Sequence, residues 1–333
     1  MTPRSEETVR VYRPGSINPR VVCIGGGHGL STMLRGLKRY TKNITAIVTV
    51  ADDGGGSGML RDDLGMLPPG DIRNCILALA NTEPTMEKLL NYRFSGGSLS
   101  GQSFGNLFLA AMNGISDTFD EAVHRMGDVL AITGRVLPVT NQDVRLEALF
   151  ENGTTVLGES KIFLHKKEAD CRITRVRLVP EHPQALPESL DAIRAADLIV
   201  LGPGSLYTSI IPNFLVDGVA QAVTASEAPK VLVLNIMTQE GETEGYTGYD
   251  HVRAVMRHGG RGVIDVCVAN STPVADEVAE AYRAEGAEQL RLEREKIEAL
   301  GVAVREFPLL SPERGARHDP AALARAILGV LEK

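Results

Sequence analysis

The sequence predicts an α/β protein with a three-layer, Rossmann-like, doubly wound and mainly parallel sheet. Short runs of branched apolar residues recur along the chain, and amphipathic segments lie between them. The runs are continuously apolar, which is typical of parallel strands covered by helices on both faces. Several runs end in glycines from which a helix begins, as at the carboxyl ends of strands in doubly wound folds.

Five apolar runs are expected to form the parallel strands, at residues 21–24, 44–50, 198–201, 231–236 and 264–269. The amphipathic segments between them are expected to form helices, at residues 30–40, 71–80 and 119–130. Because strands and helices alternate, the helices should cover both faces of one sheet. Such folds bind ligands at the carboxyl ends of their strands.

The middle of the chain follows a different pattern. Residues 144–150 alternate apolar and polar side chains, and an Asn-Gly pair at 152–153 provides a preferred two-residue hairpin turn. Residues 173–179 alternate again, as a further antiparallel strand would. We therefore expect an antiparallel insertion at about 136–180. It would lie inside one α/β domain spanning 21–333, preceded by a flexible leader at 1–20.

Composition restricts the class of protein. The 333 residues are 43% hydrophobic and 23% charged, which is ordinary for a soluble globular chain. The net charge of −7 disfavours nucleic acid or an anionic membrane as a bulk partner. No apolar run is long enough to insert into a membrane, and the four scattered cysteines fit a reducing compartment. The sequence thus predicts a cytoplasmic protein.

A glycine-rich loop follows the first strand. Its residues are Gly25, Gly26, Gly27, His28 and Gly29. Glycines let a ligand approach the backbone closely, and free N–H groups at the start of the next helix attract phosphate. The loop is neither a P-loop nor the full dinucleotide fingerprint. It predicts phosphate or nucleotide contact, and the alternative is a tight turn with no ligand.

Two adjacent acids, Asp52 and Asp53, follow the second strand. In dinucleotide-binding folds, an acid at about this position accepts hydrogen bonds from ribose hydroxyls. Two carboxylates could instead hold Mg²⁺ through oxygen ligands, and a third interpretation is a solvated loop. A second glycine run at 54–58 comes directly after the acids and favours a ligand site.

Two helix starts add polar candidates. In the segment 68–74, Arg73 and Asn74 occupy the first turn, where a ligand held by neighbouring loops could meet them, while Asp71 is a favoured N-cap residue. The segment 100–106 opens an apolar helix, and its Asn106 could read a base or a sugar. For both segments the alternative is a purely structural helix start.

The second half of the chain supplies the remaining candidates. Glycines and hydroxyl side chains follow the strand at 198–201, as expected for the second side of a ligand cleft; they are Gly202, Gly204, Ser205, Tyr207 and Thr208. The long polar segment 235–250 is expected to be a lid or a sugar-recognition loop. Tyr282 is a candidate for aromatic stacking, and Arg317 is a candidate phosphate-binding group.

Six motifs in one order carry a family resemblance. They are Gly-Gly-Gly-His-Gly-Leu at 25–30, Ile-Thr-Ala-Ile-Val-Thr-Val-Ala-Asp-Asp-Gly-Gly at 44–55, Pro-Pro-Gly-Asp-Ile-Arg-Asn at 68–74, Gly-Pro-Gly-Ser-Leu-Tyr-Thr-Ser-Ile-Ile-Pro-Asn at 202–213, Asn-Ile-Met-Thr-Gln-Glu-Gly-Glu-Thr at 235–243 and Tyr-Thr-Gly-Tyr-Asp-His-Val at 246–252. Together they resemble the YvcK-type gluconeogenesis factors of the CofD-like superfamily. The resemblance covers the chain from Val21 to its C-terminal end.

The resemblance implies a cytoplasmic protein needed for growth on gluconeogenic carbon sources and for cell shape. It also implies binding of a nucleotide sugar of the UDP-N-acetylglucosamine type, at positions 25–29, Asp52, Asp53, Asn106 and 202–208. The enzyme branch of the superfamily uses Mg²⁺ to transfer a phospholactyl group from an activated nucleotide to a deazaflavin. Where the family usually has threonine this chain has His28, and where histidine is usual it has Gln102.

Two hypotheses of function follow, and no catalytic residue is assigned in either. One is a non-catalytic nucleotide-sugar-binding regulatory factor that acts through a regulatory protein partner, because the cleft shows no recognisable nucleophile or acid–base pair. The other is a Mg²⁺-dependent transferase of the CofD type, with Asp52 or Asp53 holding the metal. A nicotinamide dehydrogenase is disfavoured, since the glycine loop lacks the full fingerprint. A monomer and a homo-oligomer both stay open.

Overall fold

The computed structural model describes residues 18–169, 171–313 and 315–332. The leader expected at 1–20 therefore lies outside the described residues, apart from 18–20. Within them, a parallel sheet has the strand order β10-β9-β8-β7-β1-β2-β3. Its strands are β1 Val21–Gly25, β2 Ile44–Val48, β3 Arg135–Pro138, β7 Leu198–Leu201, β8 Lys230–Val233, β9 Val266–Asn270 and β10 Ala303–Phe307. The prediction of a mainly parallel, Rossmann-like sheet is confirmed.

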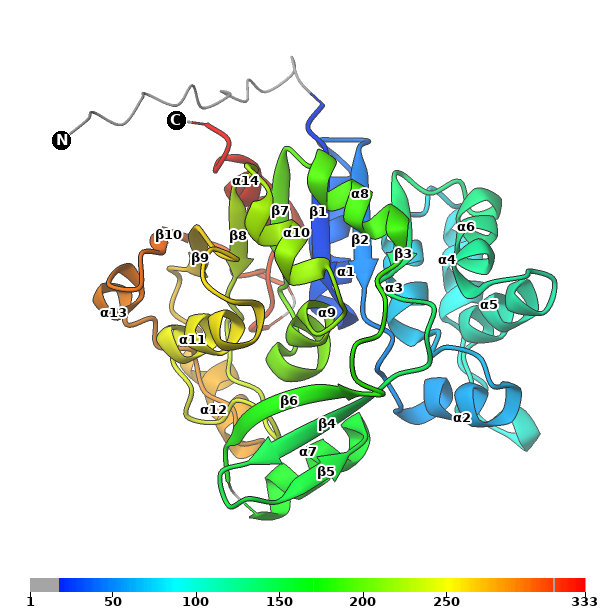
Figure 1. Cartoon of the computed structure of the whole chain (residues 1–333), viewed down its shortest axis with the longest axis horizontal. Helices are drawn as coiled ribbons and strands as arrows, with labels where there is room; N and C mark the ends of the chain where they lie inside the picture. Colours follow the sequence, from blue (N-terminus) through cyan, green and yellow to red (C-terminus); the bar gives the residue numbers. More distant parts are fainter. Residues whose placement is uncertain (1–17, 170, 314, 333) are drawn as a thin grey trace.

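Helices cover both faces of this sheet (Figure 1). One face carries α1 (Gly27–Leu37), α3 (Gly70–Leu79) and α14 (Pro320–Leu328). The opposite face carries α8 (Pro187–Ala195), α9 (Ile211–Phe214), α10 (Val219–Ala225) and α11 (Gly248–Gly259). The two helical layers and the sheet between them form the expected three-layer architecture.

Further helices lie beyond the two edges of the sheet. Next to β3 are α2 (Gly55–Leu64), α4 (Pro84–Asn91), η1 (Gly97–Leu99), α5 (Phe104–Gly114) and α6 (Phe119–Val129). On the side of β9 and β10 are α12 (Asp276–Ala284) and α13 (Arg294–Glu298). A short π-helical turn, η2 (Leu206–Ile210), follows β7 and leads into α9.

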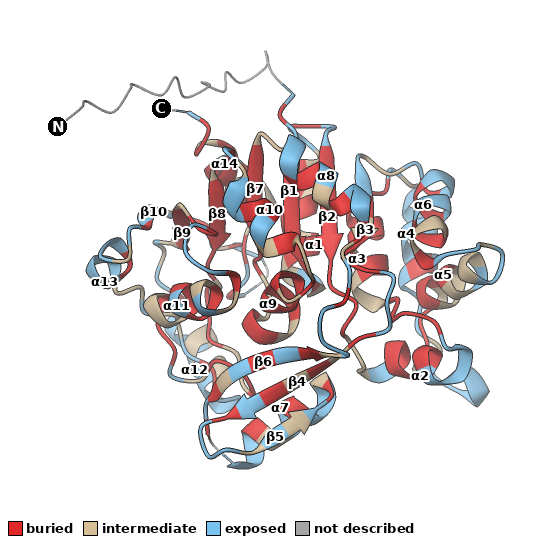
Figure 2. Ribbon diagram, in the orientation of Figure 1, coloured by how far each residue is buried: buried red, intermediate tan, exposed pale blue. Residues whose placement is uncertain are grey.

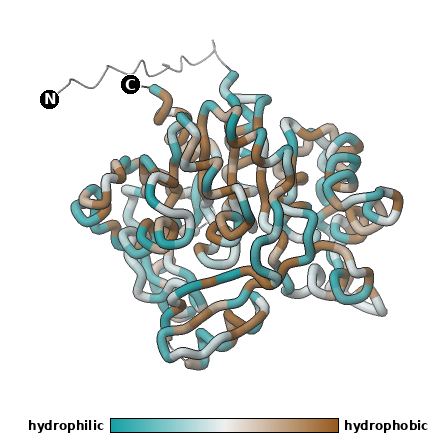
Figure 3. Tube along the Cα trace, viewed as in Figure 1, coloured by the Kyte–Doolittle hydropathy of each residue, from teal (hydrophilic) through white to brown (hydrophobic). Residues whose placement is uncertain are grey.

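The core follows the pattern of apolar residues. Every residue of β1, β2, β7 and β8 is buried, as expected for strands covered on both faces. Figure 2 shows this burial concentrated in the central strands, and Figure 3 shows the same strands as the most apolar part of the trace. Helix α1 buries Leu30, Met33, Leu34 and Leu37, which share one helix face, and the helix itself lies beside α3 and α14.

The antiparallel insertion forms a separate three-stranded sheet of order β5-β4-β6. Its strands are β4 Arg145–Phe150, β5 Thr155–Leu157 and β6 Ile173–Val179, and helix α7 (Glu159–Ala169) packs on β4 and β5. The expected start near residue 136 instead belongs to the main sheet, because Val136 pairs in parallel with Ala46 of β2. Neither α7 nor β10 was predicted.

The carboxyl ends of the parallel strands point toward the antiparallel insertion (Figure 1). The loops that follow β1, β2, β7 and β8 therefore meet α7 in space, although residues 159–169 are far from most of them in the sequence. In the described parts of the chain, no helix is both long and apolar enough to cross a membrane.

Candidate functional site

A cavity of about 520 Å³ lies at the carboxyl ends of the parallel strands. Glycine loops, acids, hydroxyl groups and amides from segments far apart in the sequence line it together. They are Gly27, His28, Gly29, Thr32, Asp52, Asp71, Glu159, Pro203, Gly204, Ser205, Ser209, Asn235, Ile236, Met237, Thr238, Gln239, Ala316, Arg317 and His318. The location agrees with the rule that doubly wound sheets bind ligands at this edge.

The start of helix α1 forms one wall. Gly27 has a φ of +68°, a conformation that favours glycine, and a Cβ on Gly29 would lie 2.4 Å from the Pro203 carbonyl oxygen. The helix has no side-chain cap and no acid in its first turn. Its first N–H groups and its dipole therefore favour an anion, although the Gly27 N–H already donates to Asp71.

Two basic side chains flank the helix start. His28 and Arg317 both line the cavity, and Arg317 comes from the loop before α14. Partial burial lowers the pKa of His28, and the positive charges of Arg317, Arg73 and Arg35 lower it further. Because cations surround it, His28 would gain a proton more readily when an anion binds between them.

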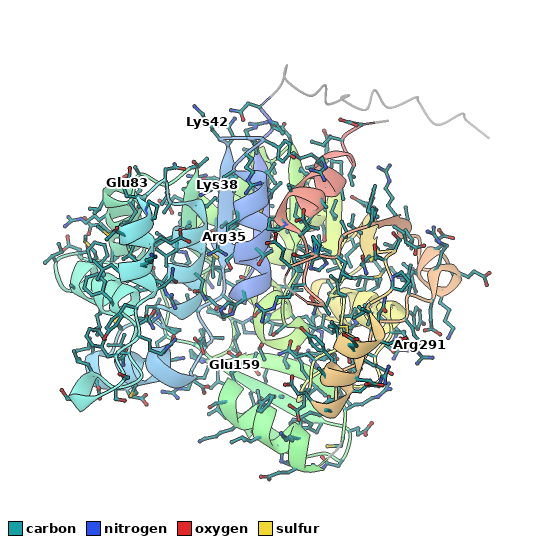
Figure 4. All side chains as sticks on the ribbon, turned by 180° about the vertical axis from the view of Figure 1, so that it is seen from behind. Arg35, Lys38, Lys42, Glu83, Glu159 and Arg291 are labelled. Atoms are coloured by element: carbon teal, nitrogen blue, oxygen red, sulfur yellow. The ribbon has the colours of Figure 1, made fainter. Side chains whose placement is uncertain are left out.

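Three carboxyl groups from different elements also meet at the cavity. Burial raises the pKa of Asp52, and burial together with the charge of Asp52 raises that of Asp71 to about 7. Burial, Asp52 and Asp71 raise the pKa of Glu159 well above its usual value. Figure 4 shows Glu159 where α7 of the insertion reaches the main body. Such repulsion is relieved by protonation or by a cation placed between the acids.

The two adjacent acids predicted as a pair have different surroundings. Asp52 lines the cavity and accepts a hydrogen bond from the Gly54 N–H at 2.8 Å. Asp53 lies outside the lining and accepts one from the Ser160 N–H at 2.9 Å, at the start of α7. Asp53 therefore holds the insertion against the loop after β2.

The loops after β7 and β8 form the opposite wall, and hydrogen bonds tie them together. The Gly204 N–H donates to Asn235 Oδ1 at 3.2 Å, and Asn235 Nδ2 donates to the Gly204 carbonyl at 2.9 Å. The Ser205 hydroxyl donates to Gln239 Oε1 at 2.8 Å. This wall presents hydroxyl and amide groups, which suit polar ligand groups such as sugar hydroxyls.

His318 contributes a neutral imidazole. Burial lowers its pKa to about 4, while a hydrogen bond to the Leu234 carbonyl opposes that shift. Its Nε2 has no hydrogen-bond partner among the described residues, and the side chain lines the cavity. With its other nitrogen donating to Leu234, Nε2 is left as an acceptor for an N–H or O–H group.

The structure brings together seven of the candidates selected from the sequence. The cavity is lined by Gly27, His28, Gly29, Asp52, Gly204, Ser205 and Arg317. Ten others lie outside the lining: Gly25, Gly26, Asp53, Arg73, Asn74, Asn106, Gly202, Tyr207, Thr208 and Tyr282.

The candidates outside the cavity lining contact other residues of the protein. Arg73 Nε donates to Asn106 Oδ1 at 3.2 Å, and both side chains are buried. The Tyr207 hydroxyl lies 3.2 Å from the Ile173 carbonyl oxygen, so it faces the insertion. Tyr282 packs against a small apolar cluster that contains Ile236 and Met237.

Some lining residues had no role assigned from the sequence. Asp71 was interpreted as an N-cap, but the N-cap position is Pro69 and the Asp71 carboxylate faces α1 instead. Glu159 follows an antiparallel strand, so the carboxyl-end rule did not point to it. Asn235 and Gln239 lie in the predicted polar segment 235–250, which was the available signal for them.

Comparisons with known proteins agree on one family. The family model described as 2-phospho-L-lactate transferase CofD matches residues 21–310. A relative from Thermoanaerobacterium thermosulfurigenes is 55% identical over 315 residues, which cover 94% of this chain and 97% of that protein. A relative from Bacillus subtilis, named Gluconeogenesis factor, is 46% identical and aligned over 95% of this chain and 99% of its own length.

A solved structure agrees with these relatives. The crystal structure of a UPF0052 family member from Bacillus halodurans superimposes with a TM-score of 0.90 at 46% sequence identity. The alignment covers 94% of this chain and 100% of that one. The resemblance inferred from the six motifs is therefore confirmed: the chain belongs to the CofD family, among the gluconeogenesis factors.

Proposed function

We propose that this protein is a non-catalytic regulatory factor that binds a nucleotide sugar of the UDP-N-acetylglucosamine type. In this proposal it serves growth on gluconeogenic carbon sources and cell-shape maintenance through a regulatory protein partner. One observation carries the binding proposal. An anion-attracting helix start with two basic side chains lies across the cavity from a wall of hydroxyl and amide groups.

The wall at α1 suits the diphosphate of such a ligand. Backbone N–H groups at a helix start bind phosphate without a dedicated side chain. His28 and Arg317 add one titratable and one permanent positive charge beside them. Since the whole chain carries a net charge of −7, these two basic side chains are a local feature of the site.

The opposite wall suits the sugar and the base. Ser205, Asn235, Thr238 and Gln239 present groups that can donate or accept hydrogen bonds. His318 Nε2 adds an acceptor that has no partner within the described part of the chain and would pair with a ligand N–H or hydroxyl group. The cavity volume of about 520 Å³ is in the range typical of small-molecule sites.

Two features support a binding role without turnover. The Ser205 hydroxyl in the cavity donates to the Gln239 amide, whereas an activated serine nucleophile needs a base as its partner. The Cys23 and Cys75 thiols are buried, and burial raises the pKa of both, so neither is a ready nucleophile. All four cysteines are buried and unpaired, which agrees with the proposed cytoplasmic location.

Calorimetric titration with UDP-N-acetylglucosamine, UDP, GTP and NAD tests the proposed ligand class. We expect the UDP-sugar to bind more tightly than NAD. Arg317→Gln should weaken it at least about ten-fold, because a phosphate contact is lost. Arg39→Gln, which changes an exposed arginine beyond the far end of α1, is the matched control and should leave affinity unchanged. Absence of UDP-sugar binding would overturn the proposal.

The second candidate is a Mg²⁺-dependent transferase of the CofD type. The three carboxyl groups Asp52, Asp71 and Glu159 favour it, since a divalent cation would relieve their mutual repulsion. Among the described residues no group of three ligands is gathered as a metal cage. A site shared between one or two carboxylates and ligand phosphates still fits Mg²⁺, which usually keeps several waters. Bound Mg²⁺ would neutralise phosphate charge there.

Asp52→Asn separates the two candidates. A transferase should lose a Mg²⁺-dependent product on this substitution, and a binding protein should change only its affinity. The assay is chromatography of the nucleotide after incubation with the wild type and the variant. Mg²⁺-dependent consumption of the nucleotide by the wild type would favour the transferase.

A further inference from the structure

Glu242 joins the two loops that form the polar wall of the cavity. It lies in the loop after β8, and its side chain reaches the turn after β7. Glu242 Oε1 accepts hydrogen bonds from the Tyr207 N–H at 2.8 Å and the Thr208 N–H at 3.1 Å, and Oε2 accepts one from the Leu206 N–H at 3.0 Å. The residue is 3% exposed. One buried carboxylate thus satisfies three consecutive backbone donors at the start of η2.

These bonds connect to side chains in the cavity. The Thr208 hydroxyl also donates to Glu159, which lines the cavity from α7. On the other side, the Gln239 N–H donates to Thr243 Oγ1 at 2.9 Å, next to Glu242 in the chain. Gln239 in turn accepts from Ser205 at 2.8 Å. A displacement of the Glu242 carboxylate would therefore move both sides of the polar wall.

We propose that Glu242 is a positioning residue that locks the turn 206–208 to the loop 235–243 and so sets the shape of the ligand cavity. It does not line the cavity, and it acts through Thr208, Ser205 and Gln239. The effect on the turn follows from the hydrogen bonds alone. The effect on affinity rests on the proposed nucleotide-sugar function.

The lock depends on the charge of the carboxylate. Burial raises the pKa of Glu242 to about 7 against the lowering effect of the three N–H donors. The titratable groups facing it are Glu244 on its own loop, Glu159 on α7, and the hydroxyls of Tyr207 and Tyr246. Glu244 is itself paired with Lys166 at 3.0 Å. Protonation of Glu242 would remove the negative charge and place an O–H group among N–H donors, which would weaken the hydrogen bonds to the three backbone N–H groups.

Hydrogen exchange in the absence of ligand tests the lock directly. In Glu242→Gln, the amide nitrogen faces a backbone donor, so exchange of the amides of residues 206–208 should rise at least about ten-fold. Glu240→Gln is the matched control, because it is the same change two positions away at a surface pair with Lys167. Equal exchange at 206–208 in the wild type and Glu242→Gln would overturn the proposal.

The same amides can be followed in the unmodified protein, which covers the case of a variant that fails to fold. On lowering the pH from about 8 to about 6, exchange at 206–208, corrected for the intrinsic rate, should increase as Glu242 gains its proton. Exchange in the buried strand β1 provides the internal reference. Unchanged relative protection of 206–208 across this range would contradict a lock that depends on the carboxylate.

Affinity provides the readout that a purely structural residue would not alter. At about pH 8, Glu242→Gln should bind UDP-N-acetylglucosamine about ten-fold more weakly than the wild type, and this difference should shrink as the pH falls through about 7 and Glu242 gains its proton. The two proteins are compared at each pH because Asp71 and His28, which also line the cavity, titrate in both of them. An identical pH profile in both proteins would overturn the positioning role. If the wild type binds no UDP-sugar at all, the proposed function fails, and the exchange measurement alone decides whether Glu242 locks the turn.

Discussion

At the scale of single residues, Asp71 has a side-chain partner that is far away in the sequence. Its position at a proline-rich helix start favours an N-cap, yet its carboxylate accepts from the Gly27 N–H of another helix. The sequence could supply the residue type and the helix start. It could not supply the burial beside Asp52 that raises the pKa of Asp71 to about 7.

The raised pKa of Asp71 predicts a pH-dependent cost to stability. Asp71 keeps its proton up to about pH 7 in the folded state, while in the unfolded state it releases the proton near its ordinary pKa of 3.8. The proton on Asp71 therefore leaves stability undiminished below about pH 4, and the cost grows as the pH rises from there to about 7. Asp71→Asn carries no such cost. When the pH is raised from 5 to 8, the free energy of unfolding of Asp71→Asn should therefore increase relative to that of the wild type. The expected increase is on the order of 1 kcal/mol, because water in the cavity reduces the effect of the charge.

Urea unfolding of both proteins at the two pH values measures this difference. Asparagine can still accept a hydrogen bond from the Gly27 N–H, so the change isolates the charge. A stability difference that stays constant with pH would show that Asp71 does not hold its proton in the folded protein.

At the scale of elements, the close approach of α1 to the loop after β7 shapes the site. A Cβ added at Gly29 would lie 2.4 Å from Pro203 O and 2.7 Å from its carbonyl carbon. These are backbone atoms, so neither can move aside without shifting a cavity wall. Gly29→Ala should destabilise the protein by about 2 kcal/mol or more, and it should also weaken ligand binding.

Gly114→Ala provides the control for that substitution. Gly114 is the last residue of α5, is exposed, and has open space where a Cβ would lie. The substitution Gly114→Ala should stabilise the protein by roughly 0.5 kcal/mol, because alanine has a higher helix propensity than glycine. Thermal unfolding of the two variants provides the comparison, and equal melting temperatures would contradict the proposed close approach.

Elements with a strong local pattern were predictable from the sequence. The runs at 21–24 and 198–201 became β1 and β7, and the alternation at 173–179 became β6. Strand β10 was not predicted, because Arg305 and Glu306 interrupt the apolar pattern of this strand at the edge of the sheet. Helix α7 was not predicted, because only Ile162 and Lys166 are buried along it and its amphipathic pattern is therefore weak.

At the scale of the whole molecule, the candidate site joins both halves of the chain. Strands β1 and β7 pair directly in register, and this brings the glycine loop beside the loop at 202–209. The doubly wound rule could therefore predict that the loops after parallel strands meet. It could not predict that Glu159 enters from the antiparallel insertion, or that Tyr282 packs into an apolar cluster instead.

In the proposed function, this cavity binds a nucleotide sugar without converting it. Equilibrium dialysis of the protein against UDP-N-acetylglucosamine, with and without Mg²⁺, followed by mass spectrometry of the recovered nucleotide, tests this claim most directly. We expect saturable binding at one site and full recovery of the intact UDP-sugar in both conditions. Absence of binding, or a nucleotide consumed when Mg²⁺ is present, would contradict it.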